Sequence, residues 1–250
     1  MKYIVFIYLI FIVFVGIAQN PIEKEGWELT FNDEFNNQQL DREKWIDHYY
    51  WGGRFNKDGL TYYGTDQFQF TDSTIKIVAE KKDNPENLPY TSGMIDCNQS
   101  FKQQYGYFEI RSKNPVGEGF WPAFWLVTTE KWPPEIDIYE FYTNTPNQIS
   151  TTQHWLNKKG KKKMQPKSYK REDASKDFHV YAVEWSSKRI KWYYNHKKIR
   201  SSRRGTKAMI YPMHIIINLE VSKVKGMDVT KAIFPNSLEV DYVRVYQKKE

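Results

Sequence analysis

Apolar and polar positions alternate along this chain in short runs, most of them bounded by Gly, Pro, Asn or Asp. β-Branched and aromatic residues dominate the runs, which is typical of strands, and no long stretch has helical periodicity. The predicted strands are Trp27–Asn32, Ser73–Glu80, Tyr105–Ser112, Phe120–Thr128, Glu135–Tyr142, Ile149–Leu156, His179–Trp185, Arg189–Tyr194, Met213–Leu219 and Glu239–Tyr246, with a hairpin end at Tyr193–Lys197. We therefore expect an all-β chain, a jelly-roll β-sandwich of two antiparallel sheets in which one concave face forms a groove.

The first residues have the pattern of a targeting segment. Lys2 gives a positive start, Tyr3–Val15 is an unbroken apolar run, and Gly16-Ile17-Ala18 offers small residues for cleavage. The run is short for a membrane span, and a retained anchor is the competing interpretation. We expect a signal peptide at residues 1–18 and a single domain at residues 19–250, secreted or periplasmic, with no membrane association after cleavage.

The stretch Glu135–Glu140 carries three carboxylates in six residues. Side chains alternate along a strand, so Glu135 and Asp137 share a face and Glu140 has the opposite parity. A β-bulge near Ile138–Tyr139 would return Glu140 to that face, and bulges are common beside active sites. Crowded carboxylates repel one another, so one should stay protonated near neutral pH. A carboxylate beside a carboxylic acid is the equipment of glycoside hydrolysis.

Aromatic residues make up 17% of the chain, and flat aromatic faces suit sugar rings. Trp121 and Trp125 are an even number of residues apart just before the acidic stretch, so they share a face of their strand. They could form an aromatic floor beside the carboxylates, or they could pack in the core. Glu109 and Arg111 also share a strand face, as groove-floor groups or as a surface ion pair. His154 could tune a carboxyl group or be structural.

The net charge is +7, and loss of Lys2 with the signal peptide would leave +6. Much of the excess lies at Lys158–Lys163, followed by Lys167, Lys170 and Arg171. The simpler interpretation is a solvated loop, and the functional one is a rim that attracts an anionic polymer such as a sulfated polysaccharide. No nucleic-acid-binding motif is present, so nucleic acid is not expected as a partner. A Gly-x-Ser-x-Gly elbow and transition-metal ligand spacing are also absent from the sequence.

The chain resembles glycoside hydrolase family 16, the laminarinase, lichenase, agarase and carrageenase group, over nearly all of its mature length. The acidic stretch matches the family's Glu-x-Asp-x-x-Glu motif in its bulged form. The other matching segments are Trp27–Phe35, Tyr90–Gly93, Tyr105–Arg111, Trp121–Trp125, Phe178–Trp185 and Val240–Tyr246. The resemblance implies a concanavalin-like sandwich and an endo-acting, retaining hydrolase whose domain at 19–250 is catalytic.

The resemblance also implies roles for individual residues. Glu135 would be the nucleophile, Glu140 the general acid/base, and Asp137 the residue that holds and tunes Glu135. The implied substrate-binding residues are Trp121, Trp125, Glu109, Arg111 and His154.

No cofactor is implied for catalysis, although many members of the family bind a structural calcium ion. Asp241 and Glu34 stand where the resemblance would place it. Because Cys97 is the single cysteine, no internal disulfide is possible, and calcium would be a useful brace.

Three departures from the laminarinase pattern bear on the substrate. Asp58–Tyr63 replaces the usual Asn-Glu-x-Gln-Tyr-Tyr motif, Met94 stands where many members have Arg, and Pro134 replaces a Gly. We expect a monomeric enzyme that cleaves a polysaccharide, with laminarin-type β-1,3-linked glucan as the first substrate. The alternatives are a β-galactan (agar, porphyran, carrageenan or a host galactan) and a noncatalytic lectin-like module on the same sandwich.

Overall fold

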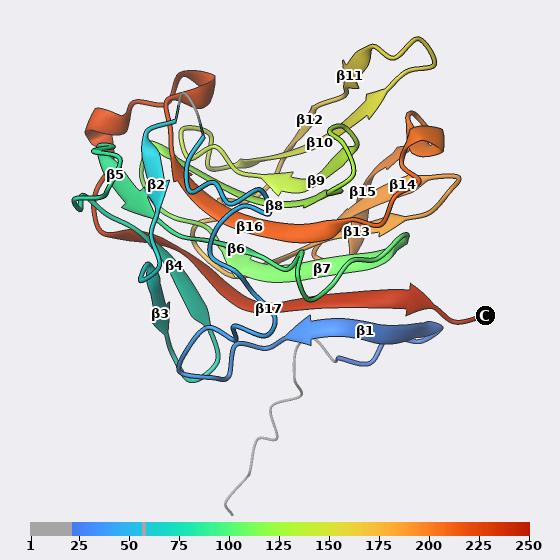
Figure 1. The fold of residues 1–250 in the computed structure, drawn as a ribbon, viewed down its shortest axis with the longest axis horizontal. Helices are drawn as coiled ribbons and strands as arrows, with labels where there is room; N and C mark the ends of the chain where they lie inside the picture. Colours follow the sequence, from blue (N-terminus) through green and yellow to red (C-terminus); the bar gives the residue numbers. More distant parts are fainter. Residues whose placement is uncertain (1–21, 57–58) are drawn as a thin grey trace, which may run out of the picture.

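Two antiparallel sheets stacked on one another make up most of the molecule (Figure 1). The computed structural model describes residues 22–56 and 59–250, so the predicted signal peptide lies outside the described residues. All ten predicted strands are present, and their ends shift by at most three residues. The predicted all-β sandwich is therefore confirmed, as is the hairpin end at Tyr193–Lys197. Within the described ranges, no helix is long and apolar enough to cross a membrane.

The larger sheet has eight strands. They are β1 (Trp27–Asp33), β3 (Phe68–Phe70), β4 (Ile75–Ala79), β7 (Gly106–Lys113), β13 (His179–Trp185), β14 (Ile190–Tyr194), β15 (Lys197–Ser202) and β17 (Asn236–Lys248). Their spatial order is β15-β14-β13-β7-β17-β4-β3, and β1 pairs with β17.

The second sheet has seven strands. They are β6 (Met94–Asp96), β8 (Phe120–Val127), β9 (Glu135–Glu140), β10 (Gln148–Leu156), β11 (Lys162–Met164), β12 (Lys167–Lys170) and β16 (His214–Val221). Their order is β11-β10-β9-β8-β16-β6, with β12 also paired to β10. Figure 1 shows the strands bowed, so that the outer face of this sheet is concave.

Smaller elements border the two sheets. A parallel pair, β2 (Thr61–Tyr63) and β5 (Tyr90–Ser92), stands at one end of the concave face. Three 3-10 helices are found among the described residues: η1 (Thr206–Ala208), η2 (Val224–Gly226) and η3 (Val229–Lys231). The yellow β11 hairpin rises at the other end of the concave face.

The core lies between the two sheets because alternate residues of each strand point inward. In β16, Ile215, Ile217 and Leu219 are buried in the core, and Phe108 and Ile110 of β7 belong to the same cluster. Each such side chain contributes roughly 1.5–3 kcal/mol by leaving water. The intervening β16 positions point to the concave face, which is how Asn218 and Glu220 reach the cleft there.

The lysine-rich segment is more ordered than a solvated loop. Lys162–Met164 forms β11 and Lys167–Lys170 forms β12, and both strands pair with β10. The interpretation as a plain loop is therefore wrong for these residues. Their lysine side chains are nevertheless exposed, which explains why alternation of apolar and polar residues does not mark these strands.

Candidate active site

A β-bulge in β9 brings the three carboxylates to one face. Trp125 of β8 pairs with Asp137, but Phe124 pairs with Tyr139, so Ile138 is the extra residue. Ile138 and Tyr139 are both buried on the core side. The predicted bulge is confirmed, and the strand on its other side, β10, has a matching irregularity.

The bulge is held from the opposite sheet. Trp192 of β14 is fully buried, and its indole Nε1–H donates to the main-chain oxygen of Asp137 at 3.0 Å. A bulge leaves backbone groups without their usual ladder partner, and a buried carbonyl needs a donor. Trp192 therefore fixes the backbone between Asp137 and Glu140 at the point where the strand departs from regular pairing.

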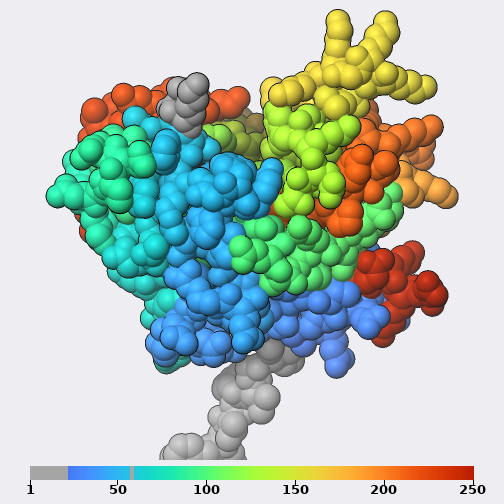
Figure 2. All heavy atoms as spheres, viewed as in Figure 1, coloured from blue at the N-terminus to red at the C-terminus, as the bar shows by residue number. Residues whose placement is uncertain are grey.

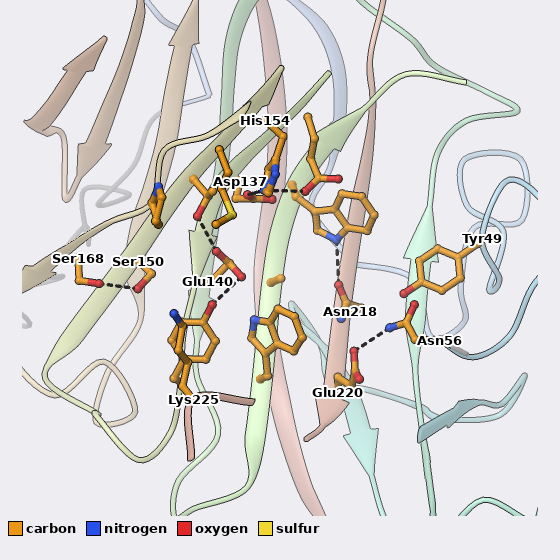
Figure 3. Close-up of a pocket in the computed structure, with 18 of the residues that line it drawn as sticks. Tyr49, Asn56, Asp137, Glu140, Ser150, His154, Ser168, Asn218, Glu220 and Lys225 are labelled. Atoms are coloured by element: carbon orange, nitrogen blue, oxygen red, sulfur yellow. Dashed lines mark hydrogen bonds and ion pairs between the residues drawn. The ribbon is translucent and has the colours of Figure 1, made fainter. Parts of the chain in front are cut away.

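The carboxylates lie in a cleft of about 430 Å³ on the concave face (Figure 3). Trp121 and Trp125 both line it, as their shared parity predicted, together with Glu220 and Tyr49. The Trp125 indole donates to Asn218 Oδ1 at 2.9 Å, which fixes its ring in the cleft wall. An aromatic floor beside the acidic strand is thus present.

Glu135 and Asp137 form one cluster with His154. The imidazole Nε2 lies 3.3 Å from Glu135 Oε1 and 3.3 Å from Asp137 Oδ2. The His154 side chain comes from β10, directly across from Glu135 in the ladder. On the other side, the Trp132 indole Nε1–H donates to Glu135 Oε2 at 2.7 Å. Both oxygens of Glu135 are therefore positioned by neighbouring rings.

Glu140 has a separate set of partners. The Tyr142 hydroxyl lies 2.8 Å from Oε1 and the Thr152 hydroxyl 2.8 Å from Oε2. Hydroxyl groups can donate to a carboxylate and can also accept from a carboxylic acid. This environment therefore allows Glu140 to hold or to release a proton without losing its orientation.

Burial and mutual repulsion raise two carboxyl pKa values. Burial, and then the charge of Asp137, raise the pKa of Glu135 to about 8. Burial, and then the charge of Glu140, raise the pKa of Asp137 well above its ordinary value. Asp137 is the more buried of the two, so we assign to it the proton that the pair retains near neutral pH. Proton retention within the cluster agrees with the expectation from crowding.

Three cleft residues, and Trp132 beside the cleft, carry no signal in the sequence pattern. Trp132 reads as part of a Pro-rich loop, and Tyr142 and Thr152 are ordinary strand-region residues. Glu220 is 6% exposed, accepts from Asn56 Nδ2 at 2.9 Å, and has its pKa raised to about 7 by burial. These residues come together only through strand pairing and loop folding, which spacing along the chain does not report.

Glu109 and Arg111 do not line the cleft, so the structure does not bring these two predicted substrate-binding residues to the acidic cluster. Both lie on β7 in the other sheet, on the face turned away from the core. Glu109 accepts from Tyr107 and Tyr242, and Arg111 pairs with Asp241. Their shared strand face was predicted correctly, but parity along a strand does not say which sheet the strand joins.

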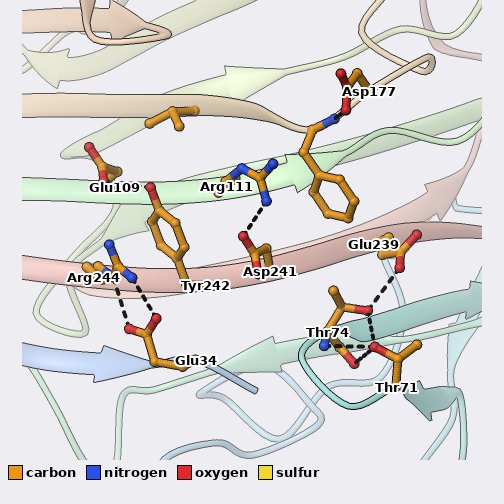
Figure 4. Close-up of polar contacts among 12 residues, drawn as sticks. Glu34, Thr71, Thr74, Glu109, Arg111, Asp177, Glu239, Asp241, Tyr242 and Arg244 are labelled. Atoms are coloured by element: carbon orange, nitrogen blue, oxygen red, sulfur yellow. Dashed lines mark hydrogen bonds and ion pairs between the residues drawn. The ribbon is translucent and has the colours of Figure 1, made fainter. Parts of the chain in front are cut away.

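Each of the two residues predicted for calcium pairs with an arginine in this arrangement. Glu34 makes two bonds to the Arg244 guanidinium, at 2.9 and 2.7 Å, and Asp241 pairs with Arg111 (Figure 4). Calcium takes six to eight oxygen ligands, and an arginine beside each carboxylate opposes a cation there. The two carboxylates are thus accounted for by separate ion pairs.

Taken together, the concave sheet, the acidic cluster and the indole rings define a jelly-roll protein with a carbohydrate-type cleft. A family model, glycosyl hydrolases family 16, matches residues 55–244. The chain is 31% identical over 244 residues to the endo-1,3-1,4-beta-glycanase EglC of Rhizobium meliloti strain 1021, covering 87% of this chain and 51% of that protein. It is 30% identical over 247 residues to the beta-glucanase of Rhodothermus marinus, covering 88% of this chain and 85% of that protein.

Among solved structures, the laminarinase catalytic domain of Thermotoga maritima superposes with a TM-score of 0.77 at 25% identity, covering 90% of this chain and all of that one. The chain spans about half the length of the first curated relatives that it matches. The match over residues 55–244 takes in the acidic strand and every strand of the two sheets except β1 and the end of β17. The protein belongs to glycosyl hydrolase family 16, as its resemblance predicted.

Proposed function

We propose that this protein is an endo-acting, retaining β-glycanase that cuts internal β-glycosidic bonds of a polysaccharide. The observation that carries the proposal is the β9 bulge, because it turns Glu135, Asp137 and Glu140 into one cleft lined by Trp121 and Trp125. A sugar-binding module has no need of three carboxylates that repel one another, whereas glycoside hydrolysis uses a carboxylate and a carboxylic acid together.

In the proposed first step, Glu135 attacks the anomeric carbon. The C1–O bond to the leaving sugar breaks while Glu140 gives its proton to the departing oxygen. Trp132 holds one oxygen of Glu135, and the protonated Asp137 beside it limits the repulsion that the attacking carboxylate feels. The product of this step is a covalent glycosyl-enzyme at Glu135.

In the proposed second step, a water molecule releases the sugar. Glu140, now ionised, takes a proton from the water as its oxygen bonds to C1, and the bond to Glu135 breaks. Both inversions occur at the same carbon, so the product keeps the β configuration. Tyr142 and Thr152 keep Glu140 oriented in both protonation states.

For the substrate, we propose a β-1,3-linked or mixed-linkage β-glucan first. The names of the relatives, endo-1,3-1,4-beta-glycanase, beta-glucanase and laminarinase, support this choice. We also propose that the chain acts as a monomer and is secreted after cleavage following Ala18, on the sequence pattern described above.

The experiment is reducing-end release from laminarin, lichenan, agarose, porphyran and κ-carrageenan by the mature protein and by Glu135→Gln. We expect oligosaccharides from laminarin or lichenan, and a loss of at least about 10³-fold in Glu135→Gln, which retains polymer binding. Release from a galactan alone would replace the glucan assignment. Binding without any release would contradict the hydrolase itself.

A further inference from the structure

A second hollow, of about 1000 Å³, lies outside the cleft at the end of β10. Five of its lining residues are basic: Lys158, Lys188, Arg189, Arg203 and Lys207. It shares no lining residue with the cleft, because His154 faces the cleft and Trp155, the next residue of β10, lines the hollow instead. We call this site the basic hollow.

Within residues 22–56 and 59–250, no carboxylate pairs with the cations of the basic hollow. Its lining contains no Asp or Glu. Within the part of the chain that the structure describes, none of the five basic side chains forms an ion pair. Like charges gathered around one concavity repel one another and focus a positive potential there, which favours an anionic ligand.

The walls of the basic hollow are fixed before any ligand arrives. In the β13–β14 turn, Ser186 and Arg189 are joined by hydrogen bonds of 2.9 Å to the Arg189 oxygen. Gly205 has a φ of 70° and lies so close to Trp155 that a Cβ would meet the indole ring at 2.6 Å. The η1 loop can therefore rest directly on the ring. Preformed walls lower the entropy cost of binding.

The basic hollow and the cleft lie beside the same hairpin, which joins β10 to β11. Lys158 lies in the turn between β10 and β11, and Lys162 of β11 has its Nζ 4.2 Å from the centre of the Trp132 ring. The Trp132 indole in turn donates to Glu135. One basic hairpin therefore borders both sites, and Figure 2 shows its side chains (yellow) projecting beside the orange segment.

We propose that the basic hollow is a second binding site, for a polysaccharide that bears sulfate or carboxylate groups. Cations drawn from three loops suit charges spaced along a polymer, and Trp155, Leu156 and Ala208 give the apolar surface that sugar rings pack against. The hairpin that gives Lys158 to the basic hollow also gives Met164 to the cleft, so the two sites lie beside one element. The inference goes beyond the proposed function, since binding here needs no hydrolysis.

The test is binding of dextran sulfate, with uncharged dextran beside it, by isothermal titration at low ionic strength. The variant is Lys188→Ser/Arg203→Ser/Lys207→Ser. The matched control is Lys176→Ser/Lys197→Ser/Lys198→Ser, which removes the same charge from exposed positions outside both hollows. Neither set includes a cleft residue, so hydrolysis of the substrate selected above should be unchanged in both.

We expect the hollow variant to lose about tenfold or more in affinity and the control about twofold or less. Equal losses would mean that net charge alone attracts the polymer, and would overturn the proposal. Binding of duplex DNA and of phosphatidylserine vesicles is measured in the same way. Tighter binding of either at equal charge concentration, lost in the hollow variant, would overturn the polysaccharide assignment. The outcome does not depend on whether the protein proves to be a hydrolase.

Discussion

At the scale of single residues, the site depends on how Glu135 is held. Burial and then the Asp137 charge raise the pKa of this carboxyl, whereas the His154 charge and the Trp132 indole, which donates to the ionised form, lower it. A nucleophile must be ionised to attack. Trp132 is thus a positioning residue that also favours the reactive form, and the sequence alone does not identify it, because it lies in a loop.

We predict that Trp132→Phe lowers kcat by about 10-fold or more and moves the acidic limb of the pH–rate profile to higher pH. The direction follows because removing a donor to the carboxylate raises the pKa of Glu135. The control is Trp121→Phe, since the Trp121 indole nitrogen has no hydrogen-bond partner among the described residues. The same pH shift in both variants would count against a specific role for Trp132.

At the scale of elements, the bulge in β9 is the feature that assembles the acidic cluster. The sequence predicts the bulge because Glu140 has the wrong parity, and the pairing of β9 with β8 confirms it. The pattern of apolar and polar residues also predicts the long strands, such as β16 and β17. The pattern does not predict three-residue strands such as β3 and β6, because three residues are too few to show the alternation that marks a strand.

We predict that Trp192→Phe destabilises the protein by about 1–3 kcal/mol and also lowers kcat. The substitution keeps most of the buried ring but leaves the Asp137 carbonyl without its donor, which frees the backbone between Asp137 and Glu140. Urea unfolding and kcat on the selected polymer would measure the two effects. Trp185→Phe is the control, because that buried indole nitrogen has no partner among the described residues. A loss of kcat in the control as large as in Trp192→Phe would contradict the assigned role.

At the scale of the whole molecule, the two-sheet architecture decides which predicted groups meet. Glu109 and Arg111 have the parity and chemistry of groove residues, yet β7 joins the other sheet and they lie far from the cleft face. Glu220 is a cleft residue because β16 lies beside β8 across the sheet. Alternation along a strand predicts which side chains share a face. Only the order of strands in the sheets decides which other residues lie beside that face.

The contribution of Glu220 to the stability of the whole molecule should fall as the pH rises. Burial raises the pKa of Glu220 from 4.5 to about 7, so between these values the folded state holds a proton that the unfolded state has released. The part of the free energy of unfolding that Glu220 contributes therefore falls across this window. We predict that Glu220→Gln, which stays neutral, flattens the fall by roughly 2–3 kcal/mol. Urea unfolding of both proteins at both ends of the window measures this difference. If Glu220→Gln changed the free energy of unfolding equally at the two pH values, the raised pKa of Glu220 would be contradicted.

The central claim, that Glu135 is the nucleophile and Glu140 the acid/base of a retaining hydrolase, is tested most directly by azide rescue. The substrate is an aryl β-oligosaccharide of the sugar that the polymer panel selects, and the product is identified by its anomeric configuration. The account predicts an α-glycosyl azide with Glu135→Ala, because azide takes the place of the nucleophile, and a β-glycosyl azide with Glu140→Ala, because azide attacks the glycosyl-enzyme. The reverse pairing of configurations, or no azide adduct with either variant, would contradict it.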